Sequence, residues 1–147
     1  MNAEPNVSYW HLWTDADGVS RQSLCALSEF EMQSISQPAD PQWLGRKQTG
    51  QMTTLVTVLP VEWIGTWHEN PHPQWIIPLS GRWFVESMDG ARVEMGPGEL
   101  SFGGDQNCQE SDGKVGHRSG TVGSEPAVLM IVQLQNATAH IAPCEFR

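Results

Sequence analysis

Positive charge is scarce in this sequence of 147 residues. It holds eight Lys and Arg against seventeen Asp and Glu, which gives a formal net charge of −9. Binding to nucleic acid or to an anionic membrane surface requires clustered cations, and the densest basic group here is the pair Arg46-Lys47. We therefore expect no nucleic-acid partner and no membrane partner.

Long apolar runs and cysteines are also few. No apolar stretch approaches the roughly 20 residues of a membrane-spanning helix, and residues 1–10 lack the basic start and apolar segment of a secretory signal. The three cysteines, Cys25, Cys108 and Cys144, are an odd number and show no C-x-x-C spacing of the zinc-binding kind. These features predict a cytoplasmic protein with reduced thiols.

Helical periodicity is scarce as well, whereas turn signals recur at short spacing. Short segments rich in Val, Ile, Thr and aromatic residues alternate with Gly, Pro and Asp turns, which predicts an all-β sandwich or barrel. The expected strands cover residues 8–13, 19–28, 51–59, 74–80, 83–88, 91–95, 100–102, 115–122 and 127–134, and the expected loops cover 37–50 and 103–113.

The length is typical of one domain, so we expect a single domain over residues 1–147. Residues 51–135 carry the stronger strand pattern and are the expected barrel core. Residues 1–50 are expected to add strands at a sheet edge or to cover the barrel. The seven tryptophans, many for this length, favour an aromatic-lined pocket.

One short segment, residues 67–81, gathers polar side chains just before a predicted strand. In an extended chain alternate residues face the same side, so His68, Asn70, His72 and Gln74 would share one face. Imidazole nitrogens bind transition metals, and side-chain oxygens complete the coordination shell. The alternative interpretation is structural, with the histidines bonded to backbone carbonyls and Gln74 buried as a satisfied amide.

A site formed by these residues needs a partner from elsewhere in the chain. His117, within Gly116-His-Arg-Ser119, is the main candidate. His11 and His140 lie near the chain ends and are weaker candidates. Cys108 would be a nucleophile only beside a base such as His117, and we interpret it as an ordinary thiol.

Residues 55–134 resemble a cupin barrel. The first cupin motif is G-x5-H-x-H-x3,4-E-x6-G, and alignment on Gly81 places Gln74 at its glutamate, His68 at its first histidine and Asn70 at its second. Glu62 stands in place of the initial glycine. The second motif ends in a histidine that corresponds to His117, after a loop longer than that motif has.

The local sequence is similar to a subgroup of small single-domain cupins with the patterns W-H-x-x-P-x-x-Q, L-S-G, G-P-G-[DE] and G-H-R-[ST]. The matching segments are residues 67–74, 79–81, 96–99 and 116–119. This resemblance implies an all-β fold, namely a cupin (jelly-roll) β-barrel with an extra N-terminal β segment. It also implies a homodimer.

The resemblance leaves the reaction open, because the cupin barrel hosts dioxygenases, isomerases, lyases and non-enzymatic binders. The first hypothesis is an enzyme acting on a small organic substrate by isomerase, lyase, dehydratase or dioxygenase chemistry. A divalent Zn, Fe, Mn or Ni ion held by His68, Gln74 and His117, with His72 as a further ligand, would polarise a substrate oxygen. Gln74 is a neutral amide where cupins have a carboxylate, which weakens such a site.

Two other hypotheses use the same pocket. In a metal-free enzyme, His68 or His117 would be the catalytic general acid-base group, because the ordinary pKa of histidine lies near neutral pH. In the third hypothesis the protein is a non-catalytic module that binds a small ligand.

Overall fold

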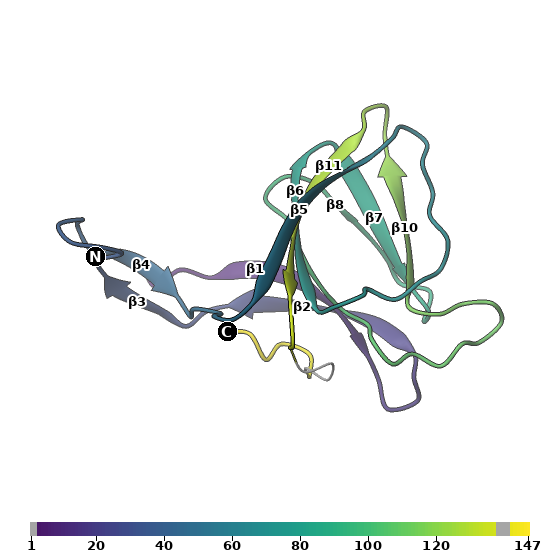
Figure 1. The fold of residues 1–147 in the computed structure, drawn as a ribbon, viewed down its shortest axis with the longest axis horizontal. Coiled ribbons are helices and arrows are strands. Elements are labelled where there is room, and N and C mark those ends of the chain that lie inside the picture. The colour runs from purple at the N-terminus through teal and green to yellow at the C-terminus, as the bar shows by residue number, and fades with distance from the viewer. Residues whose placement is uncertain (1–2, 138–141) are drawn as a thin grey trace.

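The computed structural model describes residues 3–137 and 142–147, and His140 lies outside these ranges. Within them the chain is all-β and contains no helix (Figure 1), so no helix there is long and apolar enough to cross a membrane. The strands are β1 (Val7–Thr14), β2 (Ser20–Leu27), β3 (Phe30–Gln33), β4 (Gln42–Gly45), β5 (Met52–Leu59), β6 (Gln74–Ser80), β7 (Arg82–Ser87), β8 (Arg92–Met95), β9 (Leu100–Gly104), β10 (His117–Val122) and β11 (Ala127–Leu134).

Two sheets make up the body of the molecule. The large sheet has the strand order β2-β1-β9-β6-β11-β5, and all neighbours are antiparallel except β1 and β9, which are parallel. The small sheet has the order β10-β7-β8. Residues 63–68 extend it beyond β10, because Gly65 N donates to Ser119 O at 2.8 Å and His68 N donates to His117 O at 2.9 Å.

The main core lies between the two sheets, which face each other in Figure 1. Alternation along each strand sends one side chain inward and the next outward. Leu12, Ile76 and Leu129 of the large sheet pack in one cluster with Trp83 and Val85 of the small sheet. Burying apolar area of this kind is the main favourable term in folding, so this cluster holds the sheets together.

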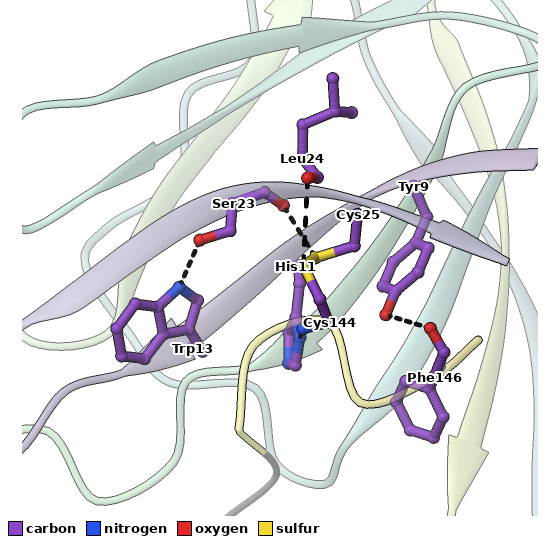
Figure 2. Close-up of a disulfide and its surroundings, with 8 residues drawn as sticks. All are labelled: Tyr9, His11, Trp13, Ser23, Leu24, Cys25, Cys144 and Phe146. Carbon is purple, nitrogen blue, oxygen red and sulfur yellow. Dashed lines mark hydrogen bonds between the residues drawn. A yellow bond between two sulfur atoms is a disulfide. The ribbon is translucent and has the colours of Figure 1, made fainter.

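A second cluster covers the outer face of the large sheet. Tyr9 and Phe102 are buried there, and Trp75 and Phe146 pack against them. Phe146 belongs to the segment 142–147, which passes over the strands. A hydrogen bond of 3.0 Å from Tyr9 Oη to Phe146 O holds this segment against the sheet (Figure 2). The large sheet is therefore buried on both faces over part of its area.

The strands expected from residues 1–28 and 51–134 are all present, with ends shifted by at most two residues. The loop expected over residues 37–50 is wrong in part, because β4 lies inside it and pairs with β3 as a hairpin. Figure 1 shows this hairpin projecting away from the sandwich. The other N-terminal strands, β1 and β2, continue the large sheet beyond β9.

Candidate functional site

Two of the predicted site residues, His68 and His117, are cross-strand neighbours. Each accepts the other's backbone N–H in a hydrogen-bonded pair with both N···O distances at 2.9 Å. Their rings lie on the same side, with centroids 4.6 Å apart. His117 is 4% exposed, whereas His68 is exposed to solvent. The pair therefore joins the interior of the sandwich to its surface.

Gly116 makes this close approach feasible. Its φ is +71°, a backbone conformation that residues other than glycine rarely adopt. A Cβ atom at this position would lie 2.2 Å from the carbonyl oxygen of His68. Any other residue here would push the segment 63–68 away from β10.

The side chain of His117 is held by a carboxylate that the sequence analysis missed. Asp105 is fully buried, and His117 Nδ1 lies 2.7 Å from Asp105 Oδ2. Burial opposes ionisation of Asp105, but the hydrogen bond and charge of His117, together with two hydrogen bonds from Asn70, outweigh it and lower the pKa of Asp105. Asp105 is therefore an ionised carboxylate at neutral pH, and His117 Nδ1 donates to it.

A chain of amide side chains continues from Asp105 through the interior. Asn70 Nδ2 donates to Asp105 Oδ1 at 2.7 Å, and Gln74 Nε2 donates to Asn70 Oδ1 at 2.6 Å. Gln133 Nε2 then donates to Gln74 Oε1 at 3.0 Å. Gly103 leaves room for Asn70, because a Cβ there would lie 2.4 Å from Asn70 Nδ2. Buried polar groups must be hydrogen-bonded. Each donor of this chain points toward the Asp105 carboxylate, which also accepts from His117 Nδ1.

These contacts determine which nitrogen of each ring carries the proton. His68 Nδ1 lies 2.8 Å from the carbonyl oxygen of Thr66, which can only accept, so His68 Nδ1 is the donor. His117 Nδ1 is the donor to Asp105. In the neutral form of each ring the lone pair is therefore on Nε2. Such a nitrogen can accept a proton or bind a metal ion.

The four predicted metal ligands do not form one donor set. Both polar atoms of Gln74 are engaged in the amide chain, so Gln74 does not fit the role of a ligand. The expected alternation also fails beyond Asn70, since residues 71–72 form a bend and β6 begins at Gln74. His72 is half-buried in that bend. His68 and His117 fit as two nitrogen ligands, and the described residues contain no group of three His, Cys, Asp or Glu side chains arranged to hold a metal.

The expectation of reduced thiols is wrong, because Cys25 and Cys144 form a disulfide across 119 residues of sequence (Figure 2). The cytoplasmic location stays a prediction, and the disulfide counts against it, since disulfides persist mainly in oxidising compartments. Cys108 is a free thiol whose pKa is raised by burial. A raised pKa disfavours the thiolate, so Cys108 is unsuited to act as a nucleophile at neutral pH.

The cavities on the described part of the molecule include four of about 640, 450, 380 and 300 Å³. None of these four is lined by His68, His72, Gln74 or His117. One of the seven tryptophans, Trp75, lines the cavity of about 450 Å³ on the outer face of the large sheet.

Sequence reasoning found His68, Gln74 and His117 but not Asp105. The missed signal is the segment Gly103-Gly-Asp105 at the end of a strand, where two small residues let the backbone run close to its neighbours and an acidic residue follows. No protein-family model matches this chain, and no curated protein does.

Proposed function

We propose that this protein is a cupin-type enzyme in which His117, oriented by Asp105, acts as a general acid-base group on a small organic substrate. The observation that carries this proposal is the buried contact of 2.7 Å between His117 Nδ1 and Asp105 Oδ2. A carboxylate in this position fixes the tautomer of the imidazole and stabilises the imidazolium that forms when Nε2 takes up a proton.

The strand order supports a cupin jelly roll. A jelly roll is a double sheet of eight strands. Four neighbouring strands of the large sheet have the order β5-β11-β6-β9. Four segments of the small sheet have the order 63–68, β10, β7, β8. The positions that correspond to the cupin motif residues also lie close together, since Asn70 bonds Gln74 and His68 pairs with His117.

In the proposed reaction His117 Nε2 removes a proton from a carbon or oxygen atom of the substrate. The resulting imidazolium keeps its Nδ1 hydrogen bond to the Asp105 carboxylate and returns the proton to another atom of the same substrate or to its leaving group. The amide chain holds Asp105 in place during both steps. His68 Nε2 is a second hydrogen-bond acceptor next to His117, and it orients the substrate by accepting a hydrogen bond from it. This sequence of proton transfers fits an isomerase or lyase reaction.

A second candidate function uses a metal at the same histidines. Ligating histidines almost always donate their other ring nitrogen to an oxygen acceptor, and both His68 and His117 do so. Zn, Fe, Mn or Ni suits imidazole nitrogen, and such an ion would polarise a substrate oxygen. The remaining ligands would be solvent or substrate, because Gln74 is committed to the amide chain.

A substrate screen with variants tests the proposal. His117→Gln and Asp105→Asn should each lower turnover about a hundredfold or more, whereas His72→Gln, a matched control in the neighbouring bend, should stay near wild type. Activity that survives in His117→Gln would contradict acid-base catalysis by this residue. Ligand binding without turnover of any substrate would favour the non-catalytic module.

Metal analysis separates the two candidate functions. Protein purified without a histidine tag is expected to retain activity after dialysis against a chelator if His117 acts alone. Activity that disappears with the chelator, returns with one divalent ion per chain and is absent in His68→Gln would favour the metal-assisted reaction.

We also propose a homodimer formed through β5. This strand is at the free edge of the large sheet, and Leu55, Val56 and Val58 are 39%, 55% and 55% exposed. Exposed apolar strand edges tend to pair with another chain. Light scattering should give the mass of a dimer for the wild type and of a monomer for Val56→Lys/Val58→Lys, and a monomeric wild type would contradict this.

A further inference from the structure

The cavity of about 450 Å³ on the outer face of the large sheet has the features of a ligand site. Its volume lies in the range of small-molecule pockets. Leu27, Trp75 and Phe146 form its apolar part. The Trp75 and Phe146 rings are 5.5 Å apart at a tilt of 50°, and Trp75 Nε1 donates to Gln48 Oε1 at 2.6 Å, which fixes the indole. A flat apolar group could pack against these two rings.

Positive charge is concentrated around the same cavity. Arg46, Lys47 and Arg147 line it, which is three of the eight basic residues in a chain of net charge −9. Glu145 is the acidic residue in the lining, and Arg46 also lies 3.7 Å from Glu29 in an exposed pair, a kind of pair that contributes little. The local surplus is therefore positive on a protein that is otherwise acidic.

The disulfide holds one wall of this cavity. Residues 145–147 line it, and they follow directly after Cys144, which is bonded to Cys25 of β2 (Figure 2). Cys144 N also donates to His11 Nδ1 at 3.3 Å, and Tyr9 Oη donates to the carbonyl of Phe146. The position of Phe146 over the cavity thus depends on a short tethered segment.

We propose that this cavity is a binding site for a small aromatic carboxylate and that the Cys25–Cys144 disulfide holds it in its binding form. The aromatic group packs on Trp75 and Phe146, and the carboxylate faces Arg46, Lys47 and Arg147. Arg side chains recognise carboxylates through paired hydrogen bonds. The site lies on the opposite face of the large sheet from His117 and does not depend on the proposed reaction.

Calorimetric titration of the full chain with 2-naphthoate tests the ligand class. Saturable binding of 2-naphthoate is expected, with the neutral 2-naphthamide at least about threefold weaker. Lys47→Gln should weaken 2-naphthoate about three- to fivefold, the effect of one exposed charge contact. The matched variant Lys114→Gln removes the other lysine, which lies over Trp67, and should bind as the wild type does. Equal binding of acid and amide, or equal loss in both lysine variants, overturns the proposal.

Titration after reduction tests the role of the disulfide. Dithiothreitol breaks the Cys25–Cys144 bond, each sulfur gains one electron and one proton, and the reagent becomes its cyclic disulfide. Because residues 145–147 then lose their tether, affinity for 2-naphthoate should fall about tenfold or more. Cys108→Ser should respond to the reductant as the wild type does. Unchanged affinity of the reduced protein overturns the role of the disulfide. Phe146→Ala keeps the disulfide and removes the aromatic wall, so full affinity in this variant overturns the site even where reduction unfolds the chain.

Discussion

Two histidines, His117 and His11, are almost completely buried but have opposite surroundings. His117 points between the sheets and donates to the buried carboxylate of Asp105 at 2.7 Å. His11 lies on the outer face of the large sheet, among aromatic rings, and is fully buried. The comparison therefore shows that two histidines with nearly the same burial can have different partners, a carboxylate beside His117 and aromatic rings around His11.

Among residues 3–137 and 142–147, no contact of His11 supplies a group that would stabilise a positive charge on its ring. Its Nδ1 accepts from Cys144 N at 3.3 Å, so the proton is on Nε2, which finds no hydrogen-bond partner among the described residues. Its ring stands edge-on to Phe102 with centroids 5.3 Å apart. Burial lowers the pKa of His11 from 6.5 to about 4. The ring of His11 is therefore neutral at neutral pH, whereas His117 contacts a carboxylate, which is the contact that supports its proposed role in proton transfer.

Removing the Asp105 carboxylate should have the largest effect, because it takes away the partner that distinguishes His117 from His11. Asp105→Ala should lower the free energy of unfolding by about 3–5 kcal/mol, because it leaves His117 Nδ1 and the Asn70 donors buried without their acceptor. Urea denaturation measures this change. Asp105→Asn keeps the shape and should cost less. If Asp105→Ala changed the free energy of unfolding by under about 1 kcal/mol, the hydrogen bond between His117 and Asp105 would not hold the inner site together.

Breaking the disulfide affects the outer face of the large sheet, around His11, and leaves the inner site of His117 intact. Cys25→Ser should lower the free energy of unfolding by about 2–4 kcal/mol, because the bond closes a long loop in the unfolded chain. Cys108→Ser is the matched control and should change stability by less than about 1 kcal/mol. Thiol titration of the unfolded, unreduced wild type should find one free thiol. Three free thiols would show that the disulfide does not form.

Acid should weaken the outer region before the inner one. Above pH 6.5 His11 is neutral in both states; as pH falls toward 4 the unfolded chain binds a proton there and the folded chain does not. Unfolding free energy should therefore fall by up to about 3 kcal/mol, the value of a shift of about 2.5 pH units. The lowered pKa of Asp105 makes its contribution disappear only below about pH 4.

The variant His11→Phe checks the assignment of this pH window. It fills the same aromatic surroundings with a ring that does not titrate, so urea denaturation between pH 6.5 and 4 should show a shallower pH dependence than the wild type. An unchanged slope in His11→Phe would mean that another group carries the acid sensitivity.

The far end of the amide chain should show the smallest effect. Gln133→Met removes the donor to Gln74 Oε1 at similar side-chain volume and should lower the free energy of unfolding by about 1 kcal/mol. Chemical denaturation measures it, with Gln135→Met as the control, since Gln135 is half-buried and makes a solvent-exposed hydrogen bond to Thr53. Equal effects of the two substitutions would show that the buried chain has no special weight.

Much of the fold could be predicted from sequence, because most strands combine β-branched residues with clear turns. The segment 74–80 and the segment 127–134 were placed with their observed ends. The β3–β4 hairpin was missed because β4 is four residues long and lies near two prolines in a polar stretch. Its pairing is local and leaves no strong alternation in the sequence.

The site was predicted only in part, because sequence does not show burial. Asp105 stands in a polar, glycine-containing stretch that is typical of a surface loop, yet it is fully buried in the structure. His72 has the same spacing as its neighbours, but the bend at residues 71–72 ends the alternation that would align it with them. The pairing of Cys25 with Cys144 depends on a chain reversal over 119 residues, which no local pattern records.

The parallel pairing of β1 with β9 protects the large sheet from aggregation. Without β1, strand β9 would present a row of free backbone N–H and C=O groups, a template for aggregation. β1 covers that row and β2 takes over the border, where Arg21 breaks the apolar pattern. Residues 7–27 therefore cover the strand edge at which the sandwich would otherwise aggregate. A fragment that starts at residue 51 lacks this cover and should precipitate rather than fold.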